Sequence, residues 1–108
     1  MKNEIIGLSE LYFTAFKNKN IELLKNLYSE DVQLIDWTGQ WYGIESVLKS
    51  NEDLFQLEYE LQVDETNIIQ NKSYNSLQIR FEEGPIDILD VLYFDDKNKI
   101  IKIRAYKG

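Results

Sequence analysis

The chain has 108 residues, of which 44% are hydrophobic and 29% charged, a composition typical of one globular domain. Its formal net charge of −7 argues against a nucleic-acid partner, because the basic face that binds a phosphate backbone is absent. The sequence contains neither cysteine nor histidine, which excludes disulfides, thiol nucleophiles and the commonest zinc ligands. Acid–base chemistry would therefore fall to Asp, Glu, Tyr or Lys side chains.

The N-terminal sequence lacks the run of about seven to fifteen apolar residues that forms the core of a signal peptide. No later run approaches the length of a membrane span. There is no repeat, low-complexity segment or linker, so residues 1–108 are expected to form a single domain. These features predict a cytoplasmic protein with no membrane partner.

Three segments carry apolar residues at helical spacing. The first helix is expected over residues 4–17, with Tyr12 in its apolar stripe and the Tyr12 ring directed at the core. Asn20 is a suitable N-cap for a second helix, which is expected to carry Tyr28 as the last residue of its inner face and to be closed by residues 29–31. The third helix carries Asn51 as the one polar residue in its apolar stripe.

The remaining segments alternate between apolar and polar residues, the pattern of half-buried strands. Such strands are expected over residues 32–37, 41–42, 57–64, 74–82, 86–94 and 100–106. The third helix falls after the second of these strands, and the last four strands follow one another without a helix. This order predicts an α+β fold, with about three helices packed on one face of a curved, mainly antiparallel sheet.

One carboxylate lies in the apolar row of the first strand, where Asp36 shares a face with Val32 and Leu34. Burying a carboxylate without a partner is costly, so its position requires an explanation. Either the strand ends there and Asp36 reaches water or caps a turn, or this face of the strand lines a pocket.

A second carboxylate, Asp90, lies in mid-strand between Ile88 and Leu92. A shifted register would turn this face outward and leave the alternate face, with Leu89 and Val91, inward. Inside an apolar pocket, desolvation and a neighbouring like charge would both raise the pKa of a carboxyl group. Two pocket carboxyls could then divide the work, one ionised as a base and one neutral as a hydrogen-bond donor.

Four motifs stand out along the chain: LYFTAF at residues 11–16, LYSEDV at 27–32, GIE at 43–45 and KIIKIRAY at 99–106. With the order of elements, they resemble the SnoaL-like, nuclear-transport-factor-2-like (NTF2-like) superfamily over nearly the whole chain. The resemblance implies a cone-shaped fold with a pocket between the helices and the concave sheet. It also implies a homodimer that pairs through the sheet.

Within that superfamily, the chain is most similar to the steroid Δ5-3-ketoisomerases. The resemblance aligns Tyr12, Asp36 and Asp90 with the site residues of that family without a gap. It implies proton transfer without a cofactor, with Asp36 as the base and with Tyr12 and a protonated Asp90 holding the oxyanion. Trp37 stands where the isomerases tend to have proline, and its indole is expected to narrow the mouth of the pocket.

Three further residues are candidates for ligand binding: Trp37, Trp41 and Asn51. The tryptophans would wall the mouth of the pocket, and Asn51 would add a polar group inside it. The plainer alternatives are that the tryptophans form core or dimer contacts and that Asn51 bonds a neighbouring loop. The sequence contains no metal-spaced cluster and no glycine-rich phosphate loop.

The function expected from these features is a pocket protein that binds a small apolar carbonyl compound. It would transfer a proton next to the carbonyl group, as an isomerase or lyase does, and would need no cofactor. The alternative is a non-catalytic ligand-binding or dimerisation module, in which Tyr12, Asp36 and Asp90 are structural.

Overall fold

The computed structural model describes residues 2–108. Its elements in chain order are α1 (Lys2–Asn18), α2 (Ile21–Leu27), β1 (Tyr28–Asp36), β2 (Gly39–Tyr42), α3 (Ile44–Phe55), β3 (Glu60–Ile69), β4 (Lys72–Phe81), β5 (Gly84–Phe94) and β6 (Ile100–Lys107). The six strands form one sheet in the order β2-β1-β6-β5-β4-β3. Strands β1 and β6 pair in parallel, and the other neighbouring strands pair antiparallel. The predicted α+β fold is confirmed.

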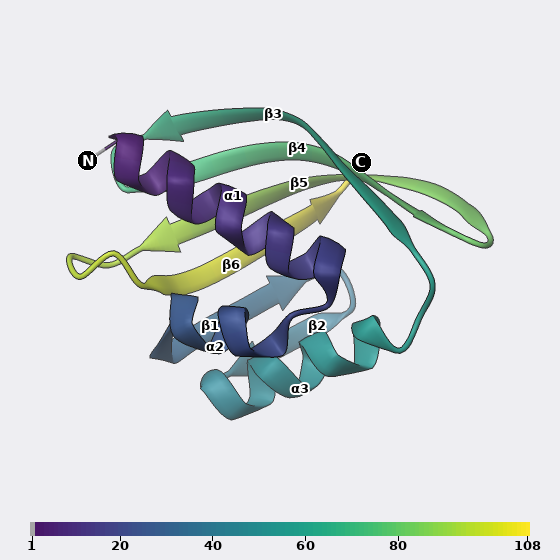
Figure 1. The fold of residues 1–108 in the computed structure, drawn as a ribbon, viewed down its shortest axis with the longest axis horizontal. Coiled ribbons are helices and arrows are strands. Elements are labelled where there is room, and N and C mark those ends of the chain that lie inside the picture. Colours follow the sequence, from purple (N-terminus) through teal and green to yellow (C-terminus); the bar gives the residue numbers. More distant parts are fainter. Residues whose placement is uncertain (1) are drawn as a thin grey trace.

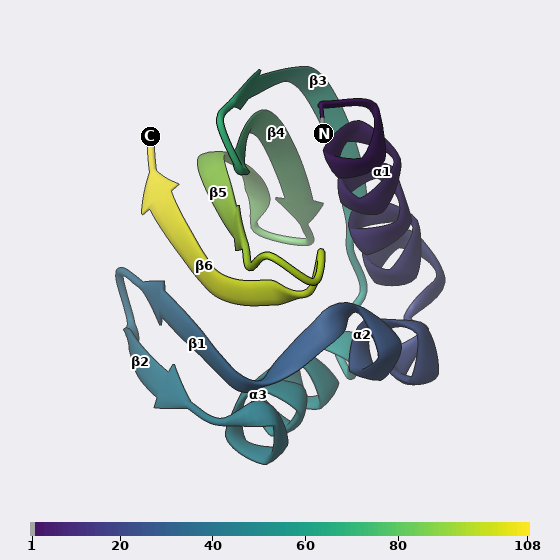
Figure 2. The same cartoon turned by 90° about the vertical axis from the view of Figure 1, so that its left-hand side faces the viewer.

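The sheet curls around one side of the molecule, and all three helices lie within the curve (Figures 1 and 2). Helix α1 packs across β3 and β4, whereas α3 packs against β1 and β2. The helices thus cover the concave face of the sheet from two directions. This arrangement leaves one space between them, and the candidate site lies there.

The first two helices begin and end largely as the sequence predicts. Asn20 caps α2, with its Oδ1 accepting a hydrogen bond from the Leu23 backbone N–H at 3.1 Å. The expectation that residues 29–31 close this helix is wrong. The backbone is already extended at Tyr28, which pairs with Ile100 of β6, so these residues belong to β1.

Helix α3 begins directly after Gly43, whose φ of 88° lies in the left-handed region that glycine adopts without strain. The Gly43 N–H donates to the Val32 carbonyl oxygen at 2.8 Å, which ties the start of α3 to β1. The helix therefore runs alongside β1 and places Asn51 on the side that faces the sheet.

A bulge in β3 contributes to the curvature of the sheet. The pairing with β4 shifts register between Val63 and Glu65, so one extra residue is accommodated there. The sequence predicted that this strand would end at residue 64, but it continues through the bulge to Ile69. A bulge bends and twists a strand, which explains how β3 can wrap over α1.

The register of the central strands decides which face of β5 points inward. Asp90 pairs with Asn75 of β4 and Ala105 of β6, and Ile88 pairs with Leu77. This face of the sheet is covered by the helices, and Asp90 is only 9% exposed. The alternative register, with Leu89 inward, is therefore wrong, and Leu89 lies on the convex face.

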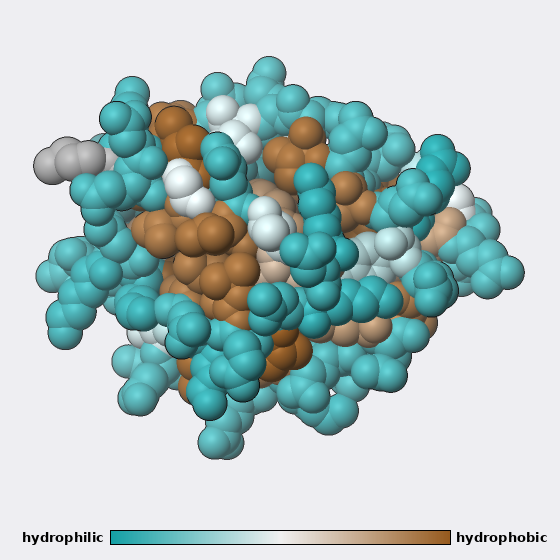
Figure 3. Space-filling view, viewed as in Figure 1, coloured by the Kyte–Doolittle hydropathy of each residue, from teal (hydrophilic) through white to brown (hydrophobic). Residues whose placement is uncertain are grey.

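The helices present a largely polar surface to solvent, although apolar atoms gather between α1 and α2 (Figure 3). Within residues 2–108, none of the helices combines the length and the apolar character that crossing a bilayer requires. The convex face of the sheet exposes Leu89 and Tyr106 in part. The homodimer that the resemblance implies through this face stays a prediction.

Candidate functional site

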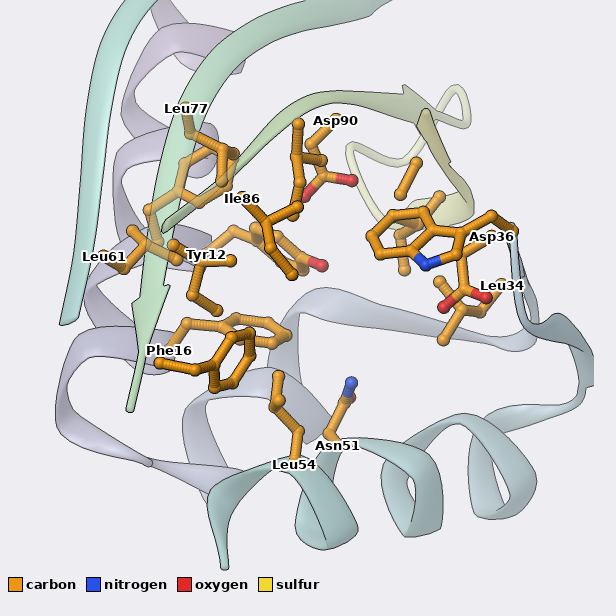
Figure 4. A pocket seen from close by; sticks show the side chains of 17 residues that line it. Tyr12, Phe16, Leu34, Asp36, Asn51, Leu54, Leu61, Leu77, Ile86 and Asp90 are labelled. Carbon is orange, nitrogen blue, oxygen red and sulfur yellow. The ribbon is translucent and has the colours of Figure 1, made fainter. Parts of the chain in front are cut away.

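A cavity of about 190 Å³ lies between the helices and the concave face of the sheet (Figure 4). Its walls are mainly apolar and come from α1, α3 and five strands. Besides the indole of Trp37, four of its lining side chains are polar: Tyr12, Asp36, Asn51 and Asp90. The fold thus brings together the three residues predicted to be catalytic and two of those predicted to bind a ligand.

Asp90 reaches the cavity from the middle of β5 (Figure 4). Its carboxyl group forms no hydrogen bond with any residue in the described part of the chain. Burial and, to a smaller extent, the nearby charge of Asp36 together raise the pKa of Asp90 from 3.8 to about 7. At neutral pH this carboxyl group is therefore partly protonated and able to donate a hydrogen bond.

Tyr12 projects from α1 into the centre of the cavity (Figure 4). Its ring is held by Phe13 and Phe16, whose ring centroids lie 5.0 and 4.8 Å away. Burial raises the pKa of Tyr12 well above its usual value, and the negative charge of Asp90 adds to this. The Tyr12 hydroxyl therefore stays protonated over the whole range in which the fold is expected to persist.

Tyr28 is a second buried tyrosine next to this site. Its hydroxyl donates to Asn51 Oδ1 at 2.6 Å, and its ring centroid lies 6.5 Å from that of Tyr12. Burial raises the pKa of Tyr28 as well. Tyr28 thus links the aromatic rings around Tyr12 to Asn51 of α3.

Asp36 lies at the end of β1 and at one side of the cavity, half-buried (Figure 4). Its Oδ1 accepts hydrogen bonds from the Thr38 backbone N–H at 2.7 Å, the Thr38 hydroxyl at 2.6 Å and the Gly39 N–H at 3.2 Å. Its Oδ2 accepts none from residues 2–108. Both explanations offered by the sequence hold, because one oxygen caps the turn while the side chain lines the cavity.

The two predicted tryptophans lie in different places. Trp37 lines the cavity and is 46% exposed, so it stands at the mouth. Trp41 is not among the lining residues: it packs against the core, and its indole lies close to Gly39. Its role in ligand binding stays a prediction, without a contact to the cavity in its support.

The sequence analysis missed Tyr28 as part of this site, because it assigned the residue to the packing face of a helix. The available signal was that a buried tyrosine hydroxyl needs a partner, and that Asn51 was the unexplained polar group in a neighbouring stripe. Within residues 2–108 no cluster of three or more acidic side chains is arranged to hold a metal ion.

No protein-family model matches the sequence, and a search of curated proteins finds no match either. Solved structures are similar in fold. An NTF2-like protein of unknown function from Cytophaga hutchinsonii is 14% identical, with a TM-score of 0.85 over 96% of this chain and 89% of that one. A candidate ketosteroid isomerase from Kribbella flavida is 15% identical, with a TM-score of 0.90 over 98% and 78%.

A candidate isomerase of the SnoaL-like family from Agrobacterium tumefaciens is 14% identical, with a TM-score of 0.83 over 98% of both chains. At these identities the likeness concerns the fold, and proteins with one fold can differ in chemistry. The curved sheet, the three helices and these likenesses agree: the protein has an NTF2-like fold.

Proposed function

We propose that the cavity binds a small carbonyl compound and transfers a proton at the carbon next to its carbonyl group. Asp36 is the base, and Tyr12 and neutral Asp90 donate hydrogen bonds to the carbonyl oxygen. The observation that carries this proposal is Asp90: a carboxyl group that opens onto an apolar cavity, has no hydrogen-bond partner within residues 2–108, and has a pKa raised to about 7. Such a group is costly as architecture and suits a donor that awaits a ligand oxygen.

In the proposed step, Oδ2 of Asp36 takes a proton from the carbon next to the carbonyl group. The electrons of that C–H bond form the carbon–carbon double bond of an enolate, and the carbonyl oxygen becomes negative. Tyr12 and Asp90 stabilise this charge in the apolar cavity, where a hydrogen bond is worth more than in water. The proton then returns from Asp36 to the same carbon or to another carbon of the enolate.

Exchange of carbon-bound protons with solvent tests the proposal, because it requires no knowledge of the physiological product. The protein is incubated in D₂O with ketones that range from cyclohexanone to a steroid ketone, and loss of the proton signal next to the carbonyl is followed by NMR. We expect catalysed exchange with at least one of them. Asp36→Asn should slow it by about 10²–10⁴-fold, the usual contribution of a general base.

The matched control is Asp31→Asn, because Asp31 lies on the same strand with an exposed side chain. The Asn side chain at position 36 keeps an oxygen for the bonds from Thr38 and Gly39, so the turn should persist. Circular dichroism checks that both variants are folded. If wild type and Asp36→Asn catalyse exchange at the same rate, Asp36 is not the base.

The second candidate is a binding module without catalysis. The three hydrogen bonds that Asp36 Oδ1 accepts in its turn favour it, because they give this carboxylate a structural role. Binding of phenols that depends on Tyr12, together with no catalysed exchange of any ketone, would select this module over the enzyme.

A further inference from the structure

Resting on the proposed function, we propose that the ligand of this cavity is an uncharged compound with a single ring and short substituents, and that Trp37 sets this size limit. Steroid-sized and fused-ring compounds are excluded, as are compounds that carry a carboxylate or phosphate. Three properties of the cavity support this: its volume, the charges on and near its walls, and the position of Trp37.

The volume of about 190 Å³ sets the size of the ligand. Pockets for drug-sized ligands span about 300–1,000 Å³. An apolar cavity of about 150 Å³ holds one benzene molecule, so in proportion this cavity holds about eight non-hydrogen atoms. A six-membered ring with one oxygen and one further carbon has this size.

The side chains of the cavity exclude an anion. No Lys or Arg is among the lining residues, whereas Asp36 and Asp90 both are. A groove that shares Phe81 and Ile86 with the cavity is lined by three further acidic residues: Glu58, Glu82 and Glu83. An anionic ligand would meet a negative potential from these side chains and would lose its hydration in the cavity with no positive charge to pair with.

The same carboxyl groups do not make the cavity a cation site. Asp90 is surrounded by apolar side chains, and its raised pKa reflects a preference for the neutral form in this environment. Of the other polar lining groups, Tyr12 and Asn51 are neutral, and Asp36 already accepts three hydrogen bonds through Oδ1 in its turn. A neutral ligand oxygen matches the two neutral donors directly.

Trp37 closes the space on the side next to Asp36. It follows the last residue of β1, lines the cavity, and is still 46% exposed. A ligand longer than one ring would have to displace its indole. Because this side chain is half in solvent and sits in a turn, Trp37→Ala should fold and should lengthen the cavity toward the mouth.

The experiment is isothermal titration with phenols, whose hydroxyl mimics the enolate oxygen. The size series is 4-methylphenol, 2-naphthol and estradiol, and the charge series replaces the methyl group of 4-methylphenol with a carboxylate or an aminomethyl group. For wild type we expect 4-methylphenol to bind tightest and 2-naphthol about tenfold more weakly or worse, the cost of overfilling a packed site. Estradiol and both charged compounds should show no binding.

In Trp37→Ala, the preference for 4-methylphenol over 2-naphthol should shrink about fivefold or more, as expected when a steric limit is removed. Tyr42→Ala is the matched control, because Tyr42 is an exposed aromatic residue that does not line the cavity, and it should leave the preference unchanged. Tyr12→Phe should weaken binding of every phenol that occupies the site.

The outcomes separate this inference from the proposed function. Binding of 2-naphthol or estradiol as tight as that of 4-methylphenol, and sensitive to Tyr12→Phe, would overturn the size limit and leave the proposed function standing. If either charged compound binds as tightly as 4-methylphenol or more tightly, the requirement for a neutral ligand is overturned. If no phenol binds, both the inference and the proposed function fail.

Discussion

On the concave face of the sheet, one group of buried polar side chains is fully hydrogen-bonded, whereas the carboxyl group in the cavity is not. Around the start of β4, Ser9, Thr66, Ser73 and Asn75 form a cluster in which every side chain is hydrogen-bonded to another. In the cavity, the Asp90 carboxyl group has no such partner within residues 2–108. The two regions touch, because the Asn75 amide donates to the backbone carbonyl oxygen of Asp90 at 3.0 Å while the Asp90 carboxyl group points into the cavity.

This difference separates architecture from function. A buried polar group with all its partners contributes a little to stability and specifies one arrangement of the core. A buried carboxyl group without partners costs stability, and its presence is explained if a ligand supplies the missing partner. Substitutions in the hydrogen-bonded cluster should therefore change mainly the free energy of unfolding. Substitutions in the cavity should change mainly the rate of ketone exchange.

After Asp36→Asn, the largest effect is expected at Tyr12. Tyr12→Phe keeps the ring contacts with Phe13 and Phe16 and removes one donor to the developing oxyanion. Loss of one such donor lowers turnover by about 10²–10³-fold, so ketone exchange measured by NMR should fall by that factor. Tyr106→Phe, on the convex face, is the control and should exchange at the wild-type rate. An unchanged rate of ketone exchange in Tyr12→Phe would show that Tyr12 has a structural role only.

The pH dependence of stability should identify Asp90. Its pKa in the folded protein is about 7 and its ordinary value is 3.8, so between these values the folded state binds the proton more tightly. The free energy of unfolding should therefore fall as pH rises from about 4 to about 7, by up to about 1.4 kcal/mol per pH unit, and level off above. Urea unfolding at several pH values measures this slope.

Asp90→Asn, which resembles the neutral carboxyl group, should lack this contribution. The difference between the two stability profiles isolates Asp90 from the other carboxylates. For the same reason wild-type exchange of ketones should decline as pH rises through about 7, because the ionised carboxyl group no longer donates. Parallel stability profiles for the two proteins would contradict the assignment.

The smallest effect is expected in the satisfied cluster. Ser9→Ala removes the hydrogen bond that Ser9 Oγ donates to Ser73 Oγ at 2.8 Å, while Ser73 keeps its bond from Asn75. Unfolding should become easier by about 1 kcal/mol, the net value of one hydrogen bond, and ketone exchange should not change. A large loss of exchange in this variant would show that the two regions are coupled.

Much of this site could be predicted from the sequence, because local patterns carry it. Helical spacing turned Tyr12 inward, and strand alternation placed Asp36 and Asp90 on apolar faces. Asn51 was noticeable as a polar residue in an apolar stripe, and the structure places it on the cavity. The pairing of neighbouring strands keeps these apolar faces on the same side of the sheet, as the alternation of apolar and polar residues predicts.

Other features depend on contacts between distant residues, which no local pattern records. Tyr28 follows a helix directly and was taken for its last inner residue, but its pairing with Ile100 makes it the start of a strand. The bonds from Thr38 to Asp36 depend on the shape of one turn. Trp41 and Trp37 look alike in the sequence, and only packing separates them.

The parallel pairing of β1 with β6 also determines when the cavity can form during synthesis. Within residues 2–108, β1 pairs only with β2 and β6, and β6 follows all the other strands in the sequence. Until β6 emerges, β1 and β2 have no connection to the remainder of the sheet, and Asp36 is not held opposite Asp90. A growing chain would thus carry the apolar faces of β1 and β5 without their common neighbour until β6 appears, and the cavity could close only then.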